Sequence, residues 1–122
     1  MEKKAVEPVS EKAPKILLEI LTYGKEENKA AMIRMNDELQ KQMDTRKAKN
    51  RVRILFYLDK GELSIEEKKA WLIDKAVCKY YVFAPEDYKI SDDYVKNLLD
   101  KIKKAEDSIQ TMKNTGINIK RN

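Results

Sequence analysis

The sequence predicts an α/β fold, a three-layer arrangement of a parallel sheet with three or more strands between helices, ending in a long C-terminal helix. Three apolar runs, at about 15–21, 52–58 and 80–84, are separated by segments with helical periodicity. The run at 52–58 is almost entirely β-branched, aromatic or Leu, which is typical of parallel strands covered on both faces. A strand–helix–strand unit this short requires a parallel pair joined by a right-handed crossover. The 122 residues suffice for one domain with a buried core.

The N-terminal third combines a polar arm, a strand and a helix. Residues 1–14 mix Lys and Glu with few apolar side chains, so we expect a flexible arm unless a partner orders it. The strand at 15–21 ends before Gly24. A helix follows from 26 or 28 to about 44, and its predicted buried stripe is Met32, Met35, Leu39 and Met43.

The central helix has a clear start signal. Ser64 and Glu67 have the spacing of a capping box, so this helix is predicted to begin at Ser64 and to end near 77–79. Cys78 lies at the helix-to-strand junction and is interpreted as a small buried residue. The predicted buried stripe of the helix is Ile65, Trp71, Leu72 and Ala76.

The C-terminal helix is predicted to begin after Ser91 and to reach Asn114, with a basic tail behind it. The stripe needed to cover a small sheet is complete at Ile102, so the apolar residues beyond it are predicted to contact a partner or another copy. The expected organisation is an arm at 1–14, a domain at 15–105, and a distal helix with tail at 106–122. The predicted partner interface comprises Ala105, Ile109 and Met112.

Composition excludes several functions. The chain carries a net charge of +5, has no His and has a single Cys, so zinc clusters, internal disulfides and histidine bases are absent. Nothing in it is apolar for long enough to span a bilayer, and no secretion signal is evident, so we expect the cytoplasm. The basic segment 41–53 lacks interleaved aromatic residues and is interpreted as a solvated face, not as a specific nucleic-acid site. Within it, Arg51 and Arg53 alternate at a strand entry, where charges protect a sheet edge.

Acidic residues mark the candidate site. Ligands of parallel sheets bind at the carboxyl ends of the strands, where Asp59 and the pair Glu86 and Asp87 fall. A solvated acidic turn is the competing interpretation of Glu86 and Asp87.

Around these residues the chain resembles a known family. Asp59 ends a strand, Glu67, Lys68 and Lys69 open the next helix, and the segment at 85–87 follows the next strand. This order is similar to the nucleotide-sugar half of family 2-type glycosyltransferases with the Rossmann-like GT-A fold, whose acidic motif is Asp-x-Asp. The resemblance covers roughly 15–102, and Pro85 stands where the first acid of the motif is expected.

The resemblance implies a nucleotide site and a metal site. It places Tyr23 against the base, Asp59 against the base or ribose, and Lys68 against a phosphate. Glu86 and Asp87 would then hold Mg²⁺ or Mn²⁺ together with the diphosphate of the nucleotide sugar.

The part of such an enzyme that carries the acceptor site and the catalytic base has no counterpart after the acidic loop. We therefore expect a non-catalytic, GT-A-derived interaction or structural module that needs no cofactor and acts as an auxiliary subunit of a larger assembly. The alternative is a minimal glycosyltransferase that binds a nucleotide sugar with a divalent metal. Frequent Lys, Asn, Ile and Tyr indicate an AT-rich genome, for which a bacteriophage particle is one hypothesis, with the virion as location.

Overall fold

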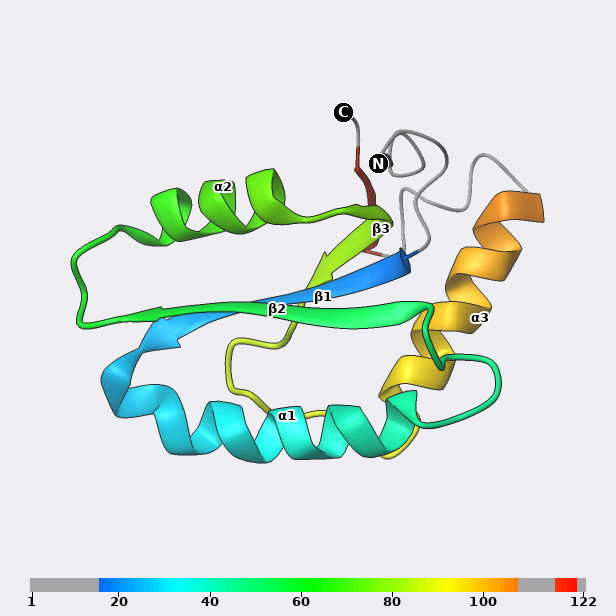
Figure 1. Cartoon of the computed structure of the whole chain (residues 1–122), viewed down its shortest axis with the longest axis horizontal. Helices are drawn as coiled ribbons and strands as arrows, with labels where there is room; N and C mark the ends of the chain where they lie inside the picture. Colours follow the sequence, from blue (N-terminus) through cyan, green and yellow to red (C-terminus); the bar gives the residue numbers. More distant parts are fainter. Residues whose placement is uncertain (1–15, 108–115, 121–122) are drawn as a thin grey trace, which may run out of the picture.

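The fold is built on a four-stranded sheet with helices on both faces (Figure 1). The structure, a computed structural model, describes residues 16–107 and 116–120. In chain order the elements are β1 (Ile16–Lys25), the 3₁₀ helix η2 (Glu26–Asn28), α1 (Lys29–Met43), β2 (Val52–Asp59), α2 (Ile65–Lys75), β3 (Cys78–Phe83), α3 (Tyr94–Asp107) and β4 (Asn118–Ile119).

The sheet has the strand order β2-β1-β3-β4. β1 pairs in parallel with β2 and β3, which confirms the three predicted parallel strands. The predicted basic tail instead contributes β4, which pairs antiparallel with β3. With β1 between β2 and β3, the order begins as in the 2-1-3-4-5 sheets and differs from the 3-2-1 order of dinucleotide-binding sheets.

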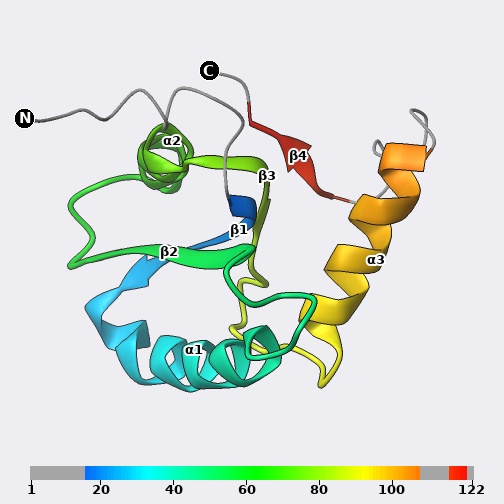
Figure 2. The ribbon, with the colours of Figure 1, turned by 45° about the vertical axis from the view of Figure 1, so that its right-hand side comes forward.

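Each face of the sheet packs against different helices. α1 and α3 lie on one face and α2 on the opposite face, as Figures 1 and 2 show from two directions. The core beneath α1 and α3 is the larger of the two clusters and includes Leu18 and Ile20 of β1. The core beneath α2 is smaller and centres on Leu21, Leu72 and Cys78.

The predicted stripe of α1 is largely correct, and α3 also buries one face. In α1, Met32, Met35 and Leu39 are buried, because spacings of three and four residues place them on the face toward the sheet. In α3, residues at the same spacings are buried against the core. These residues are Val95, Leu98, Ile102 and Ala105.

The stripe predicted for α2 is partly wrong. Ser64 forms the predicted capping box with Glu67, yet Ile65 is 51% exposed and Trp71 is 37% exposed. The helix instead turns Lys68 and Leu72 toward the sheet. Hydrophobicity alone did not identify this face, because Lys68 occupies an inward position through an ion pair with β2.

Candidate functional site

A buried ion pair lies at the carboxyl edge of the sheet, where the sequence predicted a ligand site. Lys68 Nζ of α2 lies 2.8 Å from Asp59 Oδ1 at the end of β2, and the two side chains are only 4% and 9% exposed. The same ammonium donates a hydrogen bond of 3.2 Å to the Gly24 carbonyl oxygen of β1. The structure thus brings two predicted nucleotide-binding residues together, and they bind each other.

The remaining acceptors of Asp59 close the loop that follows β2. Its Oδ1 accepts from the Gly61 N–H at 2.8 Å and its Oδ2 from the Leu63 N–H at 3.3 Å. Burial alone would raise the pKa of Asp59, but the hydrogen bonds from Lys68, Gly61 and Leu63 outweigh it and hold the pKa below its usual value. Asp59 is therefore an ionised structural carboxylate that organises the β2–α2 turn, in which Gly61 has a φ of +100°.

Tyr23, the third predicted nucleotide-binding residue, joins the acidic loop to β1. Its hydroxyl donates to Glu86 Oε2 at 3.0 Å, and the Tyr88 hydroxyl donates to the Tyr23 carbonyl oxygen at 2.9 Å. Desolvation, followed by the hydrogen bond to Glu86, raises the pKa of Tyr23 to about 12. Gly24 makes this contact feasible, because a Cβ there would lie 2.5 Å from the Tyr88 hydroxyl oxygen.

The two predicted metal ligands have other partners. Glu86 accepts the hydrogen bond from Tyr23, and Asp87 Oδ1 accepts from the Lys89 N–H at 3.0 Å. Within residues 16–107 and 116–120, no group of three or more His, Cys, Asp or Glu side chains could hold a metal ion. Glu86 and Asp87 lie in an exposed turn, and neither belongs to such a group.

One polar atom near this edge has no partner. The Thr22 hydroxyl is the only buried side-chain polar atom of the described residues that lacks a hydrogen bond, and Thr22 is 4% exposed. Thr22 lines a pocket of about 180 Å³ beside Tyr23, Pro85 and Glu86, and it also lines an apolar hollow between α1 and β2. A pocket of this size accommodates water or a small ligand group, whereas drug-sized ligands occupy about 300–1,000 Å³.

A buried carboxylate that the sequence analysis missed lies in the middle of β1. Glu19 is fully buried, and its Oε2 accepts a hydrogen bond of 2.6 Å from Arg53 Nε of β2. The Arg53 side chain itself is 44% exposed. Its Oε1 accepts from the Val77 N–H at 2.5 Å, so the carboxylate joins β1 to β2 and to the segment that leads into β3. An acidic residue inside the apolar run at 16–21 was the available signal.

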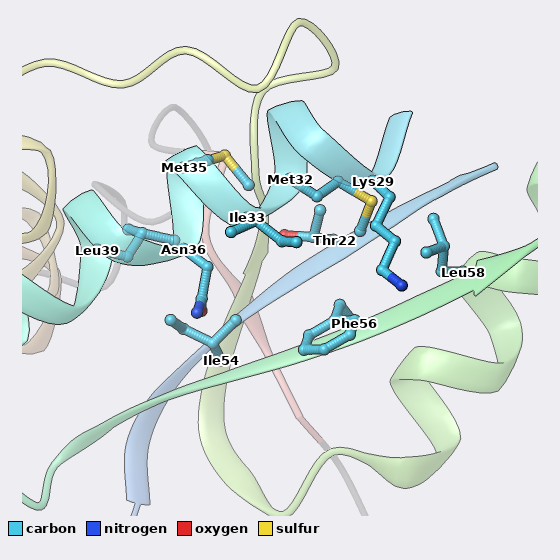
Figure 3. A pocket seen from close by; sticks show the side chains of 10 residues that line it. All are labelled: Thr22, Lys29, Met32, Ile33, Met35, Asn36, Leu39, Ile54, Phe56 and Leu58. Atoms are coloured by element: carbon cyan, nitrogen blue, oxygen red, sulfur yellow. The ribbon is translucent and has the colours of Figure 1, made fainter. Parts of the chain in front are cut away.

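An apolar hollow runs between α1 and β2. We call it the α1–β2 groove, and its volume is about 250 Å³. In Figure 3 side chains of α1 face those of β2 across it. Phe56 of β2 and Ile33 of α1 are 56% and 50% exposed, which is high for side chains of this size. The lining residues are Thr22, Lys29, Met32, Ile33, Met35, Asn36, Leu39, Ile54, Phe56 and Leu58.

β2 is also the outer strand of the sheet on this side. Its only paired neighbour among the described strands is β1. The sequence predicted this edge from Arg51 and Arg53, and both side chains are exposed. It did not predict the groove, because the Met stripe of α1 was interpreted as core in preference to an adaptable binding surface.

The interface predicted on the last helix is only partly within the described chain. Ala105 lies on α3 and is 6% exposed, so it is covered by its own chain and offers little surface to a partner. Ile109 and Met112 lie outside the described residues.

Comparison of the chain with protein-family models, with curated proteins and with solved structures gave no match. None of the helices in the described ranges is long and apolar enough to cross a membrane. Two surfaces of the described chain bear on function. At the carboxyl edge of the sheet the charged side chains bind each other, and in the α1–β2 groove apolar side chains are exposed.

Proposed function

We propose that the protein is a non-catalytic interaction module, an auxiliary subunit that binds an extended protein segment along β2 and the α1–β2 groove. One observation carries the proposal: an eight-residue apolar strand lies at the sheet edge beside a groove lined by exposed Phe56 and Ile33. Strand addition to such an edge supplies main-chain hydrogen bonds, and side-chain pockets beside it supply specificity.

The two edges of the sheet differ in a way that supports this function. β4, at the far edge, has only two residues, and short edge strands are one means by which proteins prevent unwanted pairing. β2 has eight residues, contains no Pro or Lys, and carries no charge between Arg53 and Asp59. An edge strand of this length and apolarity, left uncovered, would be an aggregation hazard. A specific partner removes that hazard.

The carboxyl edge supports a non-catalytic role for a separate reason. Catalytic or nucleotide-binding groups need free hydrogen-bonding capacity directed at the ligand. Lys68 and Asp59 instead neutralise each other at 2.8 Å, and the Tyr23 hydroxyl is engaged by Glu86. Descent from a GT-A-like glycosyltransferase remains part of the proposal, and it rests on the order of Asp59, the helix start and the acidic loop along the chain.

The alternative is a minimal glycosyltransferase. Thr22, whose hydroxyl has no hydrogen-bond partner among the described residues, lines a pocket that Glu86 also lines, and this observation favours the alternative. Thermal shift with uridine diphosphate and Mn²⁺ tests this directly. Stabilisation that requires the cation and is lost in Asp87→Ala would replace the interaction proposal with the enzymatic one.

A peptide-library selection tests the interaction proposal. The purified chain is used to select from random twelve-residue peptides, and each selected peptide is titrated against the wild type, Phe56→Lys and Ile119→Lys. Ile119 is the matched control, because it is 48% exposed and lies on the opposite edge of the sheet. We expect alternating apolar peptides that lose at least tenfold in affinity with Phe56→Lys and keep it with Ile119→Lys. Equal binding by both variants would refute the role of β2.

A further inference from the structure

We infer that the segment added to β2 is β2 of a second copy of the chain, paired antiparallel about a two-fold axis through Phe56. This inference rests on the proposed function and identifies the partner of the same edge. Its evidence is the hydrogen-bonding direction of β2, the symmetry of its side-chain pattern and the apolar surface on both sides of it.

The direction of each backbone group follows from the pairing with β1. The Leu18 N–H donates to the Arg51 carbonyl oxygen at 3.1 Å, and Leu18 is in register with Val52. In a parallel ladder the residues that bond to one neighbour alternate along the strand. The odd-numbered residues of β2 therefore bond to β1, and the even-numbered residues direct their N–H and C=O groups outward.

Phe56 is the middle one of the β2 residues whose outward backbone groups are free to bond to a second strand. The Val52 N–H is already bonded to the Ala48 carbonyl oxygen at 3.2 Å, so the available residues are Ile54, Phe56 and Leu58. An antiparallel second β2 satisfies all of them when Phe56 faces its own copy and Ile54 faces Leu58. If the axis is moved by one residue to Leu55, Leu58 faces Val52, whose N–H is engaged.

The same register matches the side chains on both faces. On the face with α1, Phe56 meets Phe56 of the other copy across the axis, which covers the most exposed large apolar side chain of the described chain. On the face with α2, Arg53 of each copy lies opposite Asp59 of the other, and both side chains keep the ion pairs that they make within their own chain, with Glu19 and Lys68. Opposite charges in facing positions stabilise a sheet, and like charges destabilise it.

A second copy fits better than an unrelated strand because β2 is complementary to itself. Read from Arg53 to Asp59, the strand is positive, then apolar, then negative, and reversing its direction exchanges the two charges. Only an antiparallel partner brings the opposite ends together. The resulting two-fold contact is isologous and closed, so it ends at a dimer and does not propagate into a fibre.

Both flanks of β2 offer apolar surface for such a dimer. Ile33 of α1 is 50% exposed beside Phe56. On the other face Trp71 is 37% exposed and packs edge-on against Tyr57, with 4.9 Å between ring centroids. Pairing of β2 would extend the sheet through both copies and bring the two α1–β2 grooves side by side.

Mass measurement across a concentration series tests the inference. We expect the wild type to reach twice the chain mass in sedimentation or light scattering. Phe56→Lys should raise the dimer dissociation constant by at least about a hundredfold, because it places two ammonium groups together at an apolar axis. The opposite-edge control, Ile119→Lys, should associate as the wild type does. A wild type that stays at single-chain mass, or a Phe56→Lys variant that still dimerises, overturns the inference.

Cross-linking tests the register. Ile54→Cys and Leu58→Cys are prepared separately, mixed and oxidised, while Cys78 is retained because it is buried. Facing residues in this register have Cα atoms about 5.5 Å apart, within disulfide range, whereas the two Ile54 positions are about 14 Å apart. We expect a disulfide in the mixture and none in either variant alone. Disulfides within the single variants would refute the register.

Failure of the inference is distinguishable from failure of the proposed function. A monomeric chain that binds the selected peptides through Phe56 keeps the interaction function and assigns the edge to another protein. A chain that neither associates nor binds such peptides refutes both.

Discussion

Arg53 is expected to contribute much more stability than its surface position indicates, and Arg53→Met tests this. The guanidinium is 44% exposed, and an exposed ion pair is ordinarily worth only about 0–1 kcal/mol. Its partner is different, because the Glu19 side chain is 0% exposed and lies 2.6 Å from Arg53 Nε. Removing the Arg leaves a buried carboxylate without its counter-charge.

The expected loss can be bounded from the contacts of Glu19. Breaking a buried pair by removing one partner costs about 3–5 kcal/mol. Glu19 keeps its hydrogen bond from the Val77 N–H at 2.5 Å, and water can enter where the half-exposed guanidinium stood. Both effects favour the lower end, so we expect Arg53→Met to lower the free energy of unfolding by about 3 kcal/mol. That is a large share of the roughly 5–15 kcal/mol typical of a domain.

Urea unfolding followed by circular dichroism measures this loss. The comparison is made in the Phe56→Lys background, so that self-association does not contribute. Arg34→Met is the control, since Arg34 is an exposed residue of α1, and a change within about 0.5 kcal/mol is expected for it. Adding Glu19→Leu should recover part of the loss, because both charges are then absent. A cost below about 1 kcal/mol for Arg53→Met would refute the buried pair.

Three further predictions concern the carboxyl edge and the thiol. Lys68→Met should lower the urea midpoint, because Lys68 is 3% exposed and neutralises Asp59, whereas a lysine free to hold phosphate could be replaced with little change. Cys78 should resist a thiol reagent at pH 8 in the native chain and react in urea, because burial, followed by the charge of Glu19, raises its pKa to about 12. Stability should fall as the pH rises from 10 to 12, because the unfolded chain releases the Tyr23 proton earlier than the native chain, whose pKa is about 12. Tyr23→Phe should reduce that slope in alkaline unfolding curves, and an unchanged slope would refute the raised pKa.

Local patterns predicted the elements of this fold well. The apolar runs located the three parallel strands, and the spacing of Ser64 and Glu67 located the start of α2. Both depend on neighbouring residues and are readable from sequence. The strand order cannot be read from the sequence in this way, because an apolar run does not specify which strand lies beside it. β4 was also missed, since two residues are too few to produce a strand pattern.

The sequence predicted where the candidate site lies but not which partners its side chains bind. The sequence placed Asp59 and Lys68 at the carboxyl edge, and the structure does bring them there. Whether they face a ligand or each other depends on the angle of α2 over the sheet, which periodicity does not fix. Glu19 illustrates the same limit, because its counter-charge, Arg53, is 34 residues away on the neighbouring strand.

The two ion pairs that tie Arg53 and Asp59 into their own chain also bear on the proposed pairing of β2. Glu19 and Lys68 hold these two side chains at opposite ends of the strand, so the charges that flank its apolar centre have fixed positions. A parallel second strand in register would place each charge beside its like, which destabilises pairing. A slip by one residue would direct the groove side chains to the wrong face. In the proposed dimer the internal pairs therefore do more than stabilise the fold: they hold the charges that favour an antiparallel arrangement, and this separates the proposed specific pairing from aggregation.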